Sequence, residues 1–499
     1  MRGVGWVIAL LAVAGCGSTV QPGAVGSDSS SMLAPTQQST SMPAGGSTGL
    51  AGPTSSGGAA IGGSAAAPDD GGAVTGGGIT GGGAADGTTG AAGGASTPSA
   101  ARSGPGFTAT EVKVGVAISS SSNAAFGAYG AKGLSFPDGK QLVNAYVAHL
   151  NRTGGIGGRH VVPVFYDYNA TGNVSTSDAA ACAAWTQDDR VVAALGVRAG
   201  ATGTDDGLTP CLSKAGVPWM SGQGDAAKFA AYPKTLYAPA LINSTRLAKA
   251  VVDALYARGF FGAGARVGVV YQDNPEMARA VSNGLRPALA AHGLPLVKQA
   301  AESNAFTESA NIELRFATAG ITHVLFAAPG GASPWQFMQS AQQNRHHYHY
   351  GISSDDQPAI ILERFAPQGQ LATTEGFGYA PTQDVDPSQA PKPTAALAAC
   401  LKVFREAGFD TSSGTAQLAM SFVCDPFELM RSGWRAAPTL SAVSLADGVD
   451  RLGTSFGVAG TFAARFAPGR HDGADAYRPL RYATGCSCFT YSGAVRRTG

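Results

Sequence analysis

Between residues 107 and 499 the chain repeats one pattern, in which a short apolar run is followed by a helical stretch. Runs that indicate buried strands lie at 111–118, 160–166 and 191–195, with helices predicted between them. Parallel strands need a crossover connection, and a helix is its usual form. The alternation therefore predicts an α/β fold with parallel sheets and right-handed crossovers.

A second set of such units begins near residue 240, with strands predicted at 266–271, 294–300 and 323–327. Three helices are predicted between residues 394 and 451, before a Gly-rich strand segment. About 390 residues exceed the usual size of one hydrophobic core. We therefore expect two lobes, each containing a parallel sheet.

Residues 17–105 differ sharply from the rest, because they contain no Phe, Trp, Tyr or Lys and are dominated by Gly, Ser and Ala. Such a segment has too little apolar surface to offset the entropy of ordering its backbone. We expect a disordered linker with a reach of about 50 Å. The net charge of +1 suggests no basic surface for nucleic acid.

The N-terminus carries an export signal. Arg2 precedes an apolar run over 4–14, which is shorter than the roughly 20 residues that span a bilayer. The run suits a secretory signal, and the sequence Val-Ala-Gly-Cys at 13–16 resembles a bacterial lipobox. Residues 1–16 are therefore predicted to be a lipoprotein signal peptide, with the lipid on Cys16. The alternative is an ordinary signal peptide with an incidental cysteine.

Six further cysteines fall as close pairs: Cys182 and Cys211, Cys400 and Cys424, Cys486 and Cys488. Export places them in an oxidising compartment, where disulfides persist. Six cysteines allow 15 connectivities, and we predict the bonds within the first two pairs. A bond within the third pair would close a small, strained ring, so its pairing stays open.

The segment 151–159 reads Asn-Arg-Thr-Gly-Gly-Ile-Gly-Gly-Arg and lies between a predicted helix and strand. Its first two glycines can end the helix with positive φ, and the next two make a tight return into the sheet. With Asp167 after the strand, this motif resembles the leucine/isoleucine/valine-binding protein family. These are type I periplasmic binding proteins, the substrate-binding lipoproteins of ABC importers.

The resemblance implies two doubly wound lobes joined by a three-segment hinge. One lobe would hold residues 107–240 and 357–455, and the other 241–356 and 456–499. A ligand would bind between the lobes, outside the carboxyl ends of the strands.

The loops at those strand ends supply the candidate ligand-binding residues: Ser119, Ser122, Arg198, Thr202, Ser221, Gln223, Tyr271, Asp355 and Asp356. The resemblance implies that an acid in the last loop holds a ligand ammonium, and Asp355 matches that position best. Thr202 and Ser221 lie in the loops that would hold a ligand carboxylate. The alternative for Asp355 is that it caps the following helix.

One residue departs from the family pattern. Asp225 stands where a hydroxyl or a small residue is usual, and its charge would repel a ligand carboxylate. Arg198 could compensate by a bidentate contact. Phe126, Tyr129 and Phe136 in the long first loop are available to line a pocket. Tyr271 and Trp335 could stack on a ligand, although aromatics near strand ends are more often core.

Other chemistries find little support. The run His-His-Tyr-His at 346–349 lacks a matching carboxylate or cysteine for a metal. Dinucleotide, phosphate-loop and nucleophile-elbow motifs are missing, so we expect no cofactor and no catalysis.

The predicted function is capture of a small polar ligand, an amino acid or related amine, for the permease of an ABC importer. The protein is expected outside the cytoplasm, anchored to the cell membrane by lipid. A ligand-sensing lipoprotein without a permease is the first alternative, and an α/β hydrolytic enzyme is the second. Ligand identity and oligomeric state stay open.

Overall fold

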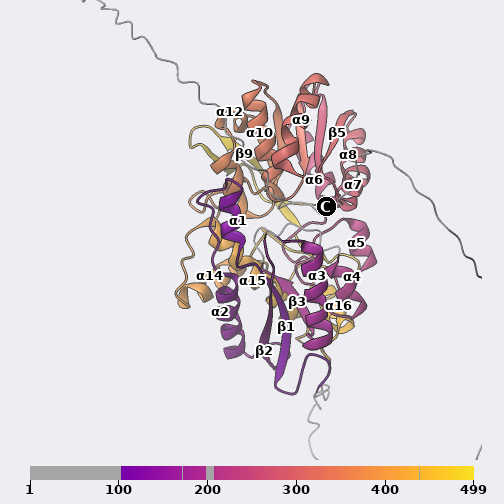
Figure 1. Ribbon diagram of the computed structural model, residues 1–499, viewed down its shortest axis with the longest axis vertical. Helices are drawn as coiled ribbons and strands as arrows, with labels where there is room; N and C mark the ends of the chain where they lie inside the picture. The colour runs from indigo at the N-terminus through magenta and orange to yellow at the C-terminus, as the bar shows by residue number, and fades with distance from the viewer. Residues whose placement is uncertain (1–102, 171, 198–206, 436, 438, 499) are drawn as a thin grey trace, which may run out of the picture.

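The computed structural model describes residues 103–170, 172–197, 207–435, 437 and 439–498. It has two lobes stacked along its long axis (Figure 1). The signal peptide, Cys16, the linker, Arg198 and Thr202 lie outside the described residues. Within these ranges, no helix has the length and apolarity to cross a membrane.

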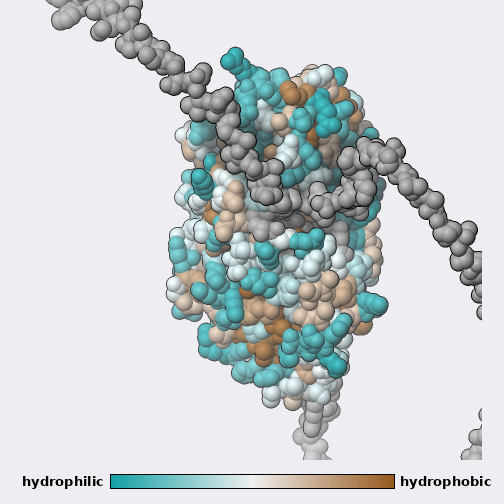
Figure 2. Space-filling model, viewed as in Figure 1, coloured by the Kyte–Doolittle hydropathy of each residue, from teal (hydrophilic) through white to brown (hydrophobic). Residues whose placement is uncertain are grey.

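The first lobe is built on three parallel strands in the order β2-β1-β3: β1 (Glu111–Ile118), β2 (His160–Asp167) and β3 (Ala193–Gly196). Single parallel bridges continue this sheet through Trp219 to Leu236. β2 is the edge strand, which explains how it tolerates Pro163, a residue without a backbone donor. Figure 2 shows a hydrophobic patch where Figure 1 draws β1 and β2.

The two faces of β1 enter different cores, as the period of two along a strand requires. Val112, Val114 and Val116 are fully buried in the core beneath the predicted helices of 394–451. Those helices are confirmed as α14 (Ala395–Glu406), α15 (Gly414–Gly433) and α16 (Ala442–Asp450), and α14 and α15 contact α2 (Gly139–Arg152). Gly115 faces the other way, where a Cβ would lie 2.8 Å from the Trp185 ring. The strand is therefore covered on both sides.

The second lobe holds a larger sheet in the order β10-β9-β8-β7-β6-β4-β5. Five of its strands run parallel: β4 (Val267–Gln272), β5 (Leu296–Glu302), β6 (His323–Ala327), β7 (His349–Ser353) and β8 (Thr374–Gly378). Two pair in antiparallel fashion: β9 (Ala476–Ala483) and β10 (Cys488–Tyr491). Three helices provide its main cover: α6 (Ser244–Tyr256), α9 (Ala305–Thr318) and α10 (Ala332–Gln343).

The predicted boundary after residue 356 needs correction. It assigned residues 357–455 to the first lobe, but β8 pairs with β7 in the second sheet, with Tyr350 opposite Thr374. The short helices between residues 358 and 371 make the crossover between these two strands. The chain therefore completes one more strand–helix unit in the second lobe before α14 begins in the first.

The predicted turn at 151–159 is present. Gly154, Gly155, Gly157 and Gly158 all have positive φ, and a Cβ on Gly155 would lie 1.8 Å from the Arg159 carbonyl oxygen. A side chain at residue 155 would thus block the return into β2.

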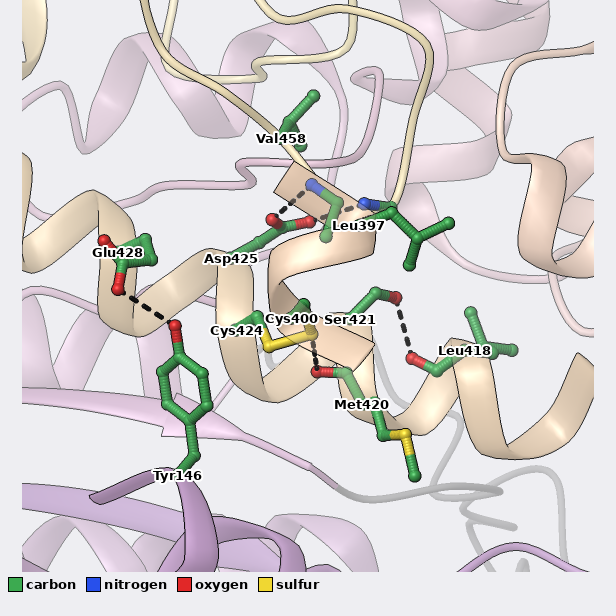
Figure 3. The surroundings of a disulfide bond; sticks show 12 residues. Tyr146, Leu397, Cys400, Leu418, Met420, Ser421, Cys424, Asp425, Glu428 and Val458 are labelled. Carbon is green, nitrogen blue, oxygen red and sulfur yellow. Dashed lines mark hydrogen bonds between the residues drawn. A yellow bond between two sulfur atoms is a disulfide. The ribbon is translucent and has the colours of Figure 1, made fainter. Parts of the chain in front are cut away.

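Both predicted disulfides are confirmed. Cys182–Cys211 joins α3 (Val174–Ala183) to α4 (Leu208–Lys214), and Cys400–Cys424 joins α14 to α15 (Figure 3). The pair that the sequence left open, Cys486 and Cys488, is bonded across the turn between β9 and β10. All six described cysteines are therefore paired.

Helix α15 also anchors the segment through which the chain leaves the first lobe. The buried Asp425 carboxylate accepts the backbone N–H of Ala459 at 2.6 Å and of Gly460 at 2.8 Å (Figure 3). Burial raises the pKa of Asp425 to about 7, against the lowering effect of these two hydrogen bonds.

Candidate ligand-binding site

A pocket of about 260 Å³ lies between the lobes. Its wall includes residues that follow the carboxyl ends of strands in both sheets: Val197 after β3, Gln272 at the end of β4, Gly330 after β6 and Asp355 after β7. In open α/β sheets, ligands bind outside these strand ends, where the strand order reverses. The reversals occur between β1 and β3 and between β4 and β6, so the pocket is where the topology predicts.

The segment after β1 closes one side of the pocket. It contains α1 (Ser122–Ala128), which lies between the lobes in Figure 1. Further along, Ala131 and Leu134 are buried in the core of the second lobe, each only 4% exposed. Phe126, Tyr129 and Phe136 line the pocket. The long first loop of the first lobe therefore docks on the second lobe.

Asp355 lines the pocket and does not cap the helix. Ser353 is the N-cap, and the Asp356 carboxylate accepts the Ser353 backbone N–H at 2.7 Å to complete a capping box. The Asp355 carboxylate instead accepts the Tyr379 hydroxyl proton. The alternative interpretation of Asp355 as a helix cap is therefore wrong, because Ser353 is the cap and Asp356 completes the capping box.

Burial raises the pKa of Asp355 to about 6, and the hydrogen bond from Tyr379 opposes this rise. The backbone is also held, because the Gly330 N–H donates to the Asp355 carbonyl oxygen at 2.7 Å. A fixed carboxyl group with a raised pKa in an apolar pocket is a candidate for contact with ligand.

Of the other predicted residues, Gln223 also lines the pocket. The Ser221 hydroxyl accepts the Gly196 N–H at 3.0 Å and so joins two loops of the first lobe. Tyr271 packs against the core of the second lobe. The predicted residues outside the pocket lining are Ser119, Ser122, Ser221, Tyr271 and Asp356.

Asp225 has a structural role that the sequence did not indicate. It is the N-cap of α5 (Ala226–Ala231), where it accepts the Lys228 N–H at 3.0 Å. It also pairs with Arg279 of α7 (Pro275–Ala280), with 2.5 Å between Oδ2 and Nε. The charge of Asp225 is therefore offset by Arg279 of the other lobe.

A second ion pair joins the same two helices, with Lys228 Nζ 2.9 Å from Glu276 Oε1. Both side chains are buried, and Glu276 lines the pocket. In the sequence, each of the two acids is followed three residues later by a base, a spacing that indicates pairs within one helix and not between two helices.

Several pocket residues were not anticipated. Phe306 lies on α9, Phe422 lies on α15, and Gln383 lies in α13 (Pro381–Asp384). Trp335 on α10, for which the sequence left ligand stacking and core packing open, also lines the pocket. Two of the three histidines of 346–349 have partners of their own, because His346 pairs with Glu313 at 2.6 Å and His349 stacks on His323. Over the described residues, no group of three or more His, Cys, Asp or Glu side chains could hold a metal ion.

Comparisons with known proteins agree with this architecture. A family model described as periplasmic binding protein matches residues 111–389. No curated protein sequence matched the chain.

Solved structures share the fold at low sequence identity. A branched-chain amino acid ABC transporter protein from Thermus thermophilus, with bound valine, is 15% identical, with a TM-score of 0.58 over 78% of this chain and 96% of that one. A Rhodopseudomonas palustris solute-binding protein in complex with 4-hydroxybenzoate is 13% identical, with a TM-score of 0.59 over 77% and 97%. A fatty acid ABC transporter substrate-binding protein from Thermomonospora curvata is 13% identical, with a TM-score of 0.55 over 79% and 92%.

The match covers more than half of the chain, and the two-lobed architecture agrees with it. The resemblance predicted from residues 151–159 is confirmed: the chain belongs to the periplasmic binding protein family and has the type I fold of the leucine/isoleucine/valine-binding proteins.

Proposed function

We propose that this protein is an extracytoplasmic lipoprotein that captures a small molecule between its lobes and delivers it to the permease of an ABC importer. The pocket between the lobes carries this proposal, because it lies at the strand ends where the fold binds its ligands. The lipobox at Cys16 and the Gly-rich segment 17–105 support a lipid tether with a long reach. Membership of the family supports a role in solute binding.

The ligand that we propose carries an amine, as amino acids do, and its ammonium group faces Asp355. Asp355 and Glu276 are the acidic residues among the described lining residues. Glu276 is already paired with Lys228, whereas the interaction found for the Asp355 carboxylate is the Tyr379 hydroxyl. An ionised carboxylate in a closed pocket loses hydration, and an ammonium partner offsets that cost.

A thermal-shift screen of amino acids and simple amines, followed by titration, tests the proposal. We expect an amine to raise the melting temperature of the wild-type protein. Removing one partner of a buried ion pair costs about 3–5 kcal/mol, so Asp355→Asn should weaken binding of that amine more than a hundredfold. The variant without ligand should melt near the wild-type temperature, because Asp355 does not cap a helix. Equal affinity in the variant and the wild type would rule out Asp355 as the amine contact.

The matched control is Asp386→Asn, which removes a carboxylate of the second lobe that accepts the Ser388 N–H in an exposed turn. This substitution should leave the affinity unchanged.

A further inference from the structure

Aromatic rings from both lobes meet at the wall of the pocket. Tyr129, from the segment after β1, has its ring centroid 5.4 Å from that of Phe306 on α9. Phe306 in turn meets Trp335 of α10 edge-on, with centroids 5.8 Å apart and an interplanar angle of 88°. All three residues line the pocket. Segments of the two lobes that are far apart in sequence thus build one wall of aromatic rings. We call Tyr129, Phe306 and Trp335 the aromatic wall.

More rings surround the same space. Phe126 and Phe136 line the pocket and contact each other, with centroids 5.6 Å apart. Phe229 and Phe422 add rings from the first lobe. Most of the remaining wall is aliphatic, including Ile242, Met277, Ile361 and Leu418. Polar side chains are the minority of the wall, among them Gln223, Gln272, Gln357 and Gln383, so most of the surface of a bound ligand would meet apolar groups.

The aromatic wall lies close to the acidic group. The Gly330 N–H donates to the Asp355 carbonyl oxygen at 2.7 Å, and the Trp335 N–H donates to the carbonyl oxygen of the next residue, Gly331, at 3.2 Å. Trp335 is therefore one helical turn from the contact that fixes Asp355. Asp355 and the three rings also line the same pocket of about 260 Å³, so one ligand can contact both.

Aromatic rings favour other rings in offset or edge-on arrangements, because their faces are negative and their edges positive. An aliphatic group of equal surface area gains the free energy of apolar burial but not the additional energy of this directional ring–ring contact. The three rings line the pocket in different orientations, since Tyr129 and Phe306 meet at 41° and Phe306 and Trp335 meet at 88°.

We propose that the ligand of this protein carries an aromatic ring, seated against Tyr129, Phe306 and Trp335, with its amine toward Asp355. The ligand class is thus an aryl-alkyl amine or an aromatic amino acid, as distinct from a small aliphatic one. This inference rests on the proposed solute-binding function. Tyr129 and Phe306 are the residues that determine the preference for a ring.

Calorimetric titration of the wild-type protein with matched probes tests the preference. The probes are 2-phenylethylamine, 2-cyclohexylethylamine, hexylamine and 3-phenylpropionate. We expect 2-phenylethylamine to bind about threefold to tenfold tighter than the cyclohexyl amine, as the directional ring–ring contact predicts. Hexylamine should bind more weakly still, since a flexible chain loses more freedom in the pocket.

The outcomes separate the two proposals. If hexylamine or the cyclohexyl amine binds as tightly as the phenyl amine, the ring inference is overturned while the amine contact stands. If 3-phenylpropionate binds as tightly as 2-phenylethylamine, the amine contact fails while the ring inference stands. If neither ring-bearing probe binds, the ring inference is overturned.

Variants locate the effect. Tyr129→Leu and Phe306→Leu keep an apolar side chain but remove the ring, so each should reduce the preference for phenyl over cyclohexyl to below about twofold. The control is Phe409→Leu, which removes a ring that contacts Phe404 in the first lobe, away from the pocket. The control should keep the full preference. Thermal melting of each empty variant identifies any loss of folding, and a preserved preference in both folded pocket variants would contradict the assignment.

Discussion

Lys228 Nζ lies 2.9 Å from Glu276 Oε1, and this buried ion pair joins helix α5 of the first lobe to helix α7 of the second. Asp225 and Arg279, on the same two helices, form a parallel pair. The Ser244 N–H also donates to the Gly224 carbonyl oxygen at 2.9 Å, next to where the chain first crosses between lobes. Charges with opposite signs thus hold the lobes together beside the pocket.

Breaking one member of the buried pair should be costly. Lys228→Met leaves the Glu276 carboxylate buried without its ammonium partner, so the free energy of unfolding should fall by about 3 kcal/mol. The double variant Lys228→Met with Glu276→Met should recover most of this loss, because it buries no unpaired charge. Urea denaturation measures both.

The control pair is Lys402 and Glu406, which is exposed on α14 at 3.7 Å. Lys402→Met should change stability by less than about 1 kcal/mol. A loss in Lys228→Met no larger than this would show that the interlobe pair does not stabilise the protein.

The affinity for an amine should depend on pH through Asp355. The pKa of this carboxyl group is raised to about 6, and only its ionised form attracts an ammonium group. Affinity should therefore be constant above that pKa and fall by up to about tenfold per pH unit below it. Measuring the affinity for the amine at several values between about pH 5 and about pH 8 gives the pH at which the affinity begins to fall.

Tyr379→Phe removes the hydrogen bond that lowers this pKa, so the affinity should begin to fall at a higher pH. Asp355→Asn should show no such fall in the same range. A fall that begins at the same pH in Tyr379→Phe as in the wild type would exclude Asp355 as the titrating group.

The disulfides should differ in their contribution to stability. Cys400–Cys424 closes a loop with a sequence separation of 24, and Cys486–Cys488 closes one with a separation of 2. Loop entropy predicts a loss of about 3 kcal/mol when the first is replaced by two alanines and about half of that for the second. Denaturation of the two double variants measures this difference, and the reverse order would contradict the loop-entropy account.

Replacing Cys16 with Ser should release the protein from membranes into the soluble fraction, because the lipid has no other attachment point in the proposed lipobox. Membrane fractionation and immunoblotting measure this. Continued membrane association of the variant would contradict lipidation at Cys16.

Local patterns in the sequence predicted much of the fold. The strand at 111–118 could be predicted from its own apolar run. The turn at 151–159 could be predicted from its glycines, which adopt the positive φ that the turn requires. The strand at Thr374–Gly378 was missed because its pairing with β7 depends on residues more than 20 positions away in the chain. Short strands are assigned by such long-range pairing more than by their own composition.

The sequence predicted only those residues of the candidate site that lie in loops directly after strands. Asp355 and Gln223 could be named because loops at strand ends face the cleft in this fold. Phe306 and Phe422 lie on helices, and which helical face meets the pocket depends on how the two lobes pack. The pairing of Asp225 with Arg279 depends on the same packing.

The central claim is that solute binds in the pocket between the lobes, and filling that pocket tests it most directly. Ala332, at the start of α10, lines the pocket, whereas Ala310 of α9 is exposed. Calorimetric titration of Ala332→Trp and Ala310→Trp with the amine that most raises the wild-type melting temperature makes the comparison. We predict that Ala332→Trp loses binding while Ala310→Trp binds as the wild type does; a folded Ala332→Trp protein that binds with wild-type affinity would contradict the claim.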